Sequence, residues 1–207
     1  MAVVYYVSHP QVRIDPAVPV PKWSLSDVGQ ARMIAVADRP WVRRLAAVVS
    51  SDETKAIETA ERLAAPSGCP VLIREEMHEN DRSATGFLPP PEFERVADAF
   101  FAEPEVSVRG WERAADAQAR ILRAVNAALA EAPAGDVALS GHGGVGTLLF
   151  CALSGIPIRR IHDQPPGGGN VFAFDRTSRT VLHPWRALEA DGIGEPACPP
   201  PPRPATA

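Results

Sequence analysis

Short apolar runs alternate with longer amphipathic segments along most of the chain. The runs are continuous, with few polar residues between the apolar ones, and a loop follows each. Continuous apolar runs of this length are typical of parallel strands that are buried on both faces of a sheet. We expect four such strands, at residues 2–7, 45–49, 70–74 and 136–140.

Apolar residues at helical spacing fill the segments between and after these runs. A helix is expected from after Ser26 to about Ala37 and another through Ala56–Ala64, where Ser50 and Glu53 have the spacing of a capping box. Three more helices are expected over residues 93–101, 111–132 and 143–154.

Two short strands near the end, at residues 171–174 and 180–183, have the pattern of a hairpin at the edge of the sheet. Alternation of strands and helices predicts an α/β fold with three layers, α/β/α, around a mostly parallel sheet. We expect a single domain over residues 1–195 and a Pro-rich, disordered tail over residues 196–207.

Polar residues that could take part in catalysis or binding lie where the four predicted strands end. Ser8-His9 follows the first strand, and Ser50-Ser51 follows the second, with Lys55 one turn into the next helix. Glu76, Glu79 and Arg82 follow the third strand, and Gly141-His142 follows the fourth. Ligands of open α/β sheets bind beyond the carboxyl ends of the strands, so these groups are expected to share one cleft.

Two histidines in one cleft favour phosphoryl transfer. A neutral imidazole is a competent nucleophile toward phosphorus at physiological pH. The transferred group needs positive charge and N–H donors around its oxygens, which Lys55, a protonated His142 and the helix start after Ser51 could provide. A carboxylic acid must protonate the leaving oxygen, and we select Glu79 for this role.

The composition sets limits on partners and location. The net charge is −4, so no global basic field would attract nucleic acid or an anionic membrane surface. The three cysteines form no CxxC pair, which favours a reducing compartment, and no signal-peptide pattern precedes Ser8, so we expect a cytoplasmic protein. The uncharged segment 137–158 contains five glycines and is expected to form a buried strand and helix instead of a membrane span.

Four blocks of the sequence resemble the histidine phosphatase superfamily, also called the phosphoglycerate mutase-like family. They are VYYVSHP at residues 4–10, LSDVG at 25–29, SSDETKAIETA at 50–60 and SGHGGV at 140–145. The resemblance implies that His9 is the phosphorylated nucleophile, His142 a residue of the phosphate pocket and Glu79 the general acid. It also implies a small phosphorylated substrate, no cofactor and no metal, without separating a phosphatase from a mutase or indicating an oligomeric state.

The chain departs from the family's pattern at two cations. Ser8-His9-Pro10 replaces the family's Arg-His-Gly, and Lys55 takes the place of an arginine in the second block. A lysine cannot grip two phosphate oxygens in fork geometry, and loss of one pocket cation costs on the order of 3 kcal/mol in the transition state. We expect Ser8, Lys55 and Gly143 to contact phosphate, with Arg82, in preference to Arg13, as the compensating cation.

Three alternatives remain open at this stage. The first is an impaired relative of the same fold that binds phosphate or another anion without turning it over. The second is a dinucleotide-binding oxidoreductase, because Gly141–Gly146 satisfies GxGxxG and Asp163 lies near the expected distance. The third is a metal site of His9, His142 and the acidic loop, although no close ligand pair such as HxxxH supports it.

Overall fold

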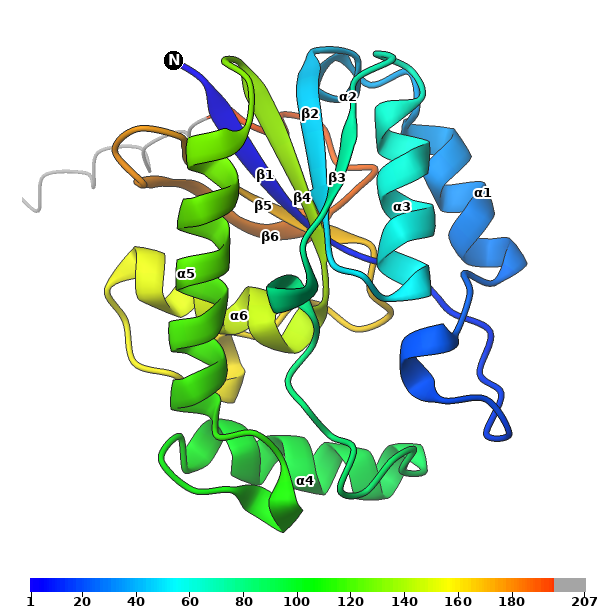
Figure 1. Cartoon of the computed structure of the whole chain (residues 1–207), viewed down its shortest axis with the longest axis vertical. Helices are drawn as coiled ribbons and strands as arrows, with labels where there is room; N and C mark the ends of the chain where they lie inside the picture. Colours follow the sequence, from blue (N-terminus) through cyan, green and yellow to red (C-terminus); the bar gives the residue numbers. More distant parts are fainter. Residues whose placement is uncertain (196–207) are drawn as a thin grey trace, which may run out of the picture.

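A six-stranded sheet forms the centre of the structure, a computed structural model that describes residues 1–195 (Figure 1). The predicted tail at residues 196–207 lies outside the described residues. The strand order is β3-β2-β4-β1-β5-β6. The strands are β1 (Val3–Ser8), β2 (Leu45–Ser50), β3 (Val71–Ile73), β4 (Asp136–Gly141), β5 (Asn170–Asp175) and β6 (Val181–Ala187).

The first four strands are parallel, and the last two form the predicted antiparallel hairpin at one edge. β1 pairs in parallel with β4 and antiparallel with β5, so it lies in the interior of the sheet. β5 pairs antiparallel with β6. The helices are α1 (Asp27–Val36), α2 (Pro40–Arg43), α3 (Thr54–Ala64), α4 (Pro90–Ala102), α5 (Ala114–Glu131) and α6 (Gly143–Ser154).

The alternation of side chains along β1 supplies two separate cores. Val4 and Tyr6 belong to the core on one face, together with residues of α5 and α6. Tyr5 and Val7 belong to the core on the other face, together with residues of α1, α2 and α3. Each fully buried side chain of this size contributes roughly 1.5–3 kcal/mol. The predicted three-layer α/β/α fold is confirmed.

The helix boundaries show one wrong expectation. Ser26 caps α1 as expected, because its hydroxyl accepts a hydrogen bond from the Gly29 N–H. Ser50 and Glu53 form no capping box: α3 begins at Thr54, with Glu53 itself at the cap position. The Ser50 hydroxyl donates to the Ser51 carbonyl. Glu53 is therefore free to point elsewhere, and it points toward the ends of the neighbouring strands.

The glycine run of residues 141–146 lies at the end of β4, between β2 and β1. The dinucleotide-binding alternative requires that Asp163 follow a strand. Instead, Asp163 ends the short helix η4 (Arg160–His162) and accepts a hydrogen bond from Thr147. The dinucleotide-binding alternative is therefore wrong. Within residues 1–195 no helix is both long and apolar enough to cross a membrane.

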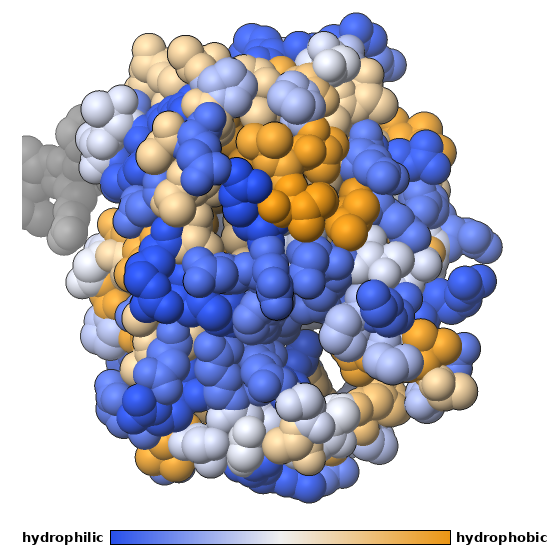
Figure 2. Space-filling view, viewed as in Figure 1, coloured by the Kyte–Doolittle hydropathy of each residue, from blue (hydrophilic) through white to orange (hydrophobic). Residues whose placement is uncertain are grey.

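The carboxyl ends of the parallel strands are partly covered by chain that does not belong to the sheet. Figure 1 shows α4 beyond these strand ends, joined to β3 by an extended segment. The loop that carries the short helix η1 (Val20–Lys22) lies near the start of α3. Figure 2 shows a hollow in the mostly hydrophilic surface between this loop and the segment that leads to α4. This hollow lies beyond the carboxyl ends of the parallel strands, where the cleft is predicted.

Candidate active site

His9 lies directly after β1 and has one ring nitrogen committed to the backbone. Its Nδ1 is 2.9 Å from the Pro10 carbonyl oxygen. A carbonyl can only accept, so Nδ1 carries the proton and the lone pair is on Nε2. Burial lowers the pKa of His9 to about 3, with the neighbouring charges of His142 and Lys55 acting in the same direction. His9 is therefore a neutral imidazole with an available Nε2 at physiological pH.

His142 follows β4 and faces His9 across the strand ends. The two ring centroids are 5.3 Å apart, with an angle of 72° between the planes. His142 is fully buried, and burial lowers its pKa against the opposing effect of Glu53 and Glu79. Its Nε2 lies 2.9 Å from the Ser51 hydroxyl, while Nδ1 has no hydrogen-bond partner among the described residues. The structure thus brings together two histidines separated by more than half of the chain.

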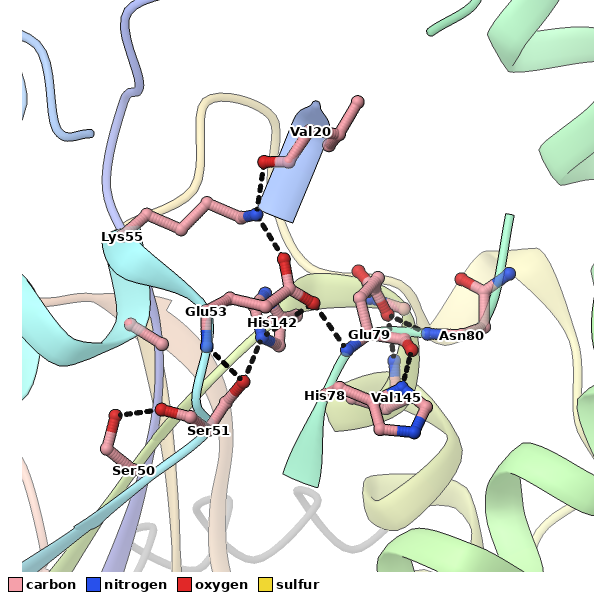
Figure 3. A network of polar contacts seen from close by, with 12 residues as sticks. Val20, Ser50, Ser51, Glu53, Lys55, His78, Glu79, Asn80, His142 and Val145 are labelled. Carbon is pink, nitrogen blue, oxygen red and sulfur yellow. Dashed lines mark hydrogen bonds and ion pairs between the residues drawn. The ribbon is translucent and has the colours of Figure 1, made fainter. Parts of the chain in front are cut away.

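Glu53 is a site residue that the sequence analysis missed. Its Oε2 contacts the Lys55 ammonium, and its Oε1 lies 3.5 Å from His142 Nε2 and accepts the Glu79 N–H at 3.0 Å (Figure 3). Burial raises the pKa of the Glu53 carboxyl, but His142 and Lys55 outweigh it and lower this pKa to about 2. Its place directly after the second strand end was the available signal, but we assigned it to a capping box.

Lys55 is buried, with only 3% of its surface exposed, and is not a solvated helix residue. Its ammonium contacts the Glu53 carboxylate and donates to the Val20 carbonyl at 3.0 Å. The predicted phosphate-binding cation thus lies in the cleft, but a carboxylate already neutralises its charge. The field that an incoming phosphate meets is weaker than a lone lysine would provide.

Glu79 reaches the N-terminus of α6. Its two carboxylate oxygens accept the Gly144 N–H at 3.1 Å and the Val145 N–H at 2.9 Å. Burial raises its pKa, but Arg82, His142 and the N–H groups of Val145 and Asn80 lower it below the usual value for glutamate. The predicted general acid is therefore in the cleft and in its ionised form at neutral pH.

Arg120 holds the backbone that carries Glu79. Its guanidinium donates to the carbonyls of Glu76, His78 and Glu79 at 2.8–3.3 Å and forms a salt bridge with Glu112. Arg120 lies on α5 with 9% of its surface exposed. This clamp has no separate signal in the sequence, because an arginine in an amphipathic helix is usually solvated.

Arg82 lies over the rings of Phe93 and Trp111, at 5.2 and 5.6 Å from their centroids. Cation–π contacts of this kind hold a guanidinium without consuming its hydrogen-bond donors. Arg82 is close enough to Glu79 to be the strongest charge that lowers the Glu79 pKa. Arg13 is exposed, so Arg82 is better placed to act as the compensating cation.

Ser8 is enclosed by other residues, and its hydroxyl is committed to them. It is fully buried; its hydroxyl donates to the Gln164 side-chain Oε1 and accepts the Asn170 N–H at 3.1 Å. Gly143 begins α6 beside His142, and its N–H donates to no acceptor within residues 1–195. Gly143 therefore offers a donor at a helix N-terminus, whereas the Ser8 proton is already committed.

Each of the groups described above can perform a different part of a phosphoryl transfer. His9 Nε2 is a neutral nucleophile, His142 lies beside it with Gly143 next in the chain, and Glu79 is a carboxyl group at the start of α6 that is not paired with a lysine. Within residues 1–195 no three His, Cys, Asp or Glu side chains gather in a group that could hold a metal ion.

The comparisons with known proteins agree with this geometry. The sequence profile of the histidine phosphatase superfamily (branch 1) matches residues 17–184. The match begins after Ser8-His9-Pro10, which is the block that departs from the family's pattern. Comparison with curated protein sequences gives no match.

Several solved structures share the fold. A mycobacterial glucosyl-3-phosphoglycerate phosphatase in complex with inorganic phosphate is 21% identical, covers 92% of this chain and 100% of its own, and has a TM-score of 0.72. The Bacillus stearothermophilus protein YhfR is 22% identical, with coverages of 89% and 95% and a TM-score of 0.73. An Escherichia coli putative alpha-ribazole-5'-P phosphatase is 17% identical, with coverages of 94% and 100% and a TM-score of 0.68. At these identities the likeness establishes the fold alone.

Proposed function

Because the chain belongs to the histidine phosphatase superfamily (branch 1), which supports a hydrolase, we propose that it hydrolyses a small phosphomonoester through a phosphohistidine on His9. The observation that carries this proposal is the His9 ring. Its Nδ1 hydrogen bond leaves Nε2 unprotonated, and the ring of His142 stands 5.3 Å away. A phosphoryl group that lies beside this pair of rings would contact both.

The reaction would proceed in two steps. His9 Nε2 forms a bond to phosphorus while the bond from phosphorus to the leaving oxygen breaks, and Glu79 in its protonated form gives that oxygen a proton. A water molecule then attacks the phosphohistidine, Glu79 accepts the water's proton, and inorganic phosphate leaves. Gly143, His142 and Lys55 would hold the non-bridging oxygens, and Arg82 would add positive charge from the rim.

An impaired, anion-binding relative of the same fold is the second candidate. The observation that favours it is the Glu53–Lys55 pair, which neutralises the cation in the phosphate pocket while Ser8 replaces the motif arginine. Both candidates predict phosphate binding, and only the first predicts turnover. We also propose a cytoplasmic location, supported by two free cysteines, Cys69 and Cys151, among the described residues.

Turnover of a panel of phosphorylated metabolites and of p-nitrophenyl phosphate by the wild type and by His9→Ala tests the proposal. We expect activity in the wild type only, together with acid-labile phosphate attached to His9 after rapid quenching. Equal and negligible turnover in both proteins, with phosphate still bound by the wild type, would leave the anion-binding candidate in its place.

A further inference from the structure

The loop between α6 and β5 lies against the position of the motif arginine. Gln164 in this loop contacts Ser8, the residue that stands where the family has arginine. We propose that the Gln164 side-chain amide is the donor that takes over the arginine's contact with a phosphate oxygen. The inference rests on the proposed function for its substrate, but its test also works for a protein that only binds phosphate.

Two donors fix the orientation of the Gln164 amide. Its Oε1 accepts from the Ser8 hydroxyl and from Asn170 Nδ2, the latter at 3.1 Å. With the oxygen on that side, the NH2 group must point the other way. Ser8 and Asn170 have exposures of 0% and 3%, so both anchors are themselves held by the core. Ser8 thus acts through Gln164 as a positioning residue.

The free Nε2 points toward the first turn of α6. A Cβ atom added at Gly143 would lie only 2.1 Å from Gln164 Nε2, so the amide occupies the space beside this residue. Within residues 1–195 Gln164 Nε2 has no hydrogen-bond acceptor, and Gly143 donates its own N–H to none of the described residues. Two donors therefore stand side by side next to His142 without an acceptor.

A separate observation points to a ligand at the same place. The Nδ1 atom of His142 is buried and has no partner, although nearly all buried polar atoms in proteins are hydrogen-bonded. Three polar atoms from three residues, Gln164, Gly143 and His142, are thus left unpaired at the start of α6. A phosphate has enough oxygens to accept from both of these donors and from His142 Nδ1, which carries the proton of the neutral ring when Nε2 accepts from the Ser51 hydroxyl.

The backbone of Gln164 is also held in place. Its N–H donates to Asp163 Oδ1 at 2.8 Å, and the same carboxylate accepts the Thr147 hydroxyl at 2.8 Å. Because Thr147 lies on α6, these two hydrogen bonds tie the loop to that helix. Donors fixed before the ligand arrives need no reorganisation on binding, which is the condition under which a neutral donor contributes most.

Binding of inorganic phosphate to the wild type, Gln164→Ala and Gln164→Glu, followed by calorimetry, tests the inference. Gln164→Glu keeps an oxygen for Ser8 and Asn170 but replaces the donor with a negative charge. We expect phosphate affinity to fall on the order of tenfold or more in Gln164→Ala and further in Gln164→Glu. Gln30→Ala, the same change on α1 away from the cleft, is the control and should bind as the wild type does.

A purely structural role for Gln164 predicts the reverse order. If Gln164 only anchors the loop, Gln164→Glu should bind phosphate better than Gln164→Ala, and the losses should follow the drop in thermal stability. That order, or the absence of phosphate binding by the wild type, would overturn the inference. Phosphate binding that depends on Gln164 without any His9-dependent turnover would overturn the proposed function alone.

Discussion

Replacing Glu53 with glutamine should leave the Lys55 ammonium without its carboxylate partner, so that its positive charge is no longer neutralised within the cleft. The Glu53 and Lys55 side chains are 9% and 4% exposed, so their charges act on each other in a largely desolvated setting. Removing one partner from such a pair costs about 3–5 kcal/mol of folding free energy, because the other charge stays buried and unpaired. Since about 1 kcal/mol shifts the Tm of a chain of this size by roughly 2–4 °C, we expect Glu53→Gln to melt roughly 6–20 °C below the wild type.

Phosphate should recover much of this loss, because it supplies Lys55 with a new partner. At an effective dielectric constant of about 20, a unit negative charge about 6 Å from the phosphate opposes it by roughly 3 kcal/mol per unit charge. This corresponds to a factor of about 100 in an equilibrium or rate constant. Allowing for screening, we expect Glu53→Gln to bind phosphate, and to turn over substrate, roughly 10- to 100-fold better than the wild type.

Calorimetric phosphate affinity, kcat/KM and the phosphate-dependent rise in Tm measure these effects. Glu61→Gln removes an exposed carboxylate from the same helix and should change none of them. A Glu53→Gln protein that folds but binds phosphate no better than the wild type would refute the reasoning. The Glu53 carboxylate would then support the site, for example by orienting His142, and would not oppose the ligand.

Four further predictions follow from the geometry of the cleft and of its supports. Glu79→Gln should lower kcat/KM by 10²–10⁴ for alkyl phosphates and far less for p-nitrophenyl phosphate, whose leaving group needs no proton; equal losses would contradict the role of Glu79 as an acid. Because the pKa of Glu79 is lowered, its protonated form becomes scarcer as the pH rises, so kcat for alkyl phosphates should increase from neutral toward acid pH. The pKa of His9 falls from 6.5 to about 3 on folding, so the unfolded state binds the extra proton and stability should decrease by up to about 1.4 kcal/mol per pH unit as the pH falls below about 6.5. Denaturant unfolding of His9→Asn should show a slope about one proton shallower in this range, and an unchanged slope would contradict the assignment. Arg120→Ala should destabilise the fold by about 3–5 kcal/mol, because Glu112 loses its buried partner, whereas Arg123→Ala on the same helix should cost little in the same measurement.

Periodicity and the strand-end rule predicted the architecture well. The continuous apolar run before His9 specified an interior parallel strand, because only a strand covered on both faces tolerates five consecutive buried side chains. The uncharged segment around His142 gave the second interior strand and the helix after it. Once both strands are parallel neighbours, the two histidines must meet at the same edge of the sheet.

The sequence by itself thus determined the layers, the main strands and helices, and the edge of the sheet at which His9 and His142 lie, since these depend on patterns that local segments carry. The strand order, which makes β1 and β4 neighbours and so brings the two histidines together, came from the tertiary structure. Only the tertiary structure decided the electrostatics of the cleft. Whether the Glu53 side chain caps a helix or neutralises Lys55 depends on where it points at the start of α3, and the burial that strengthens the pair comes from segments distant in sequence. The contact between Ser8 and Gln164 spans 156 positions and joins two uncharged residues, for which no periodic pattern exists.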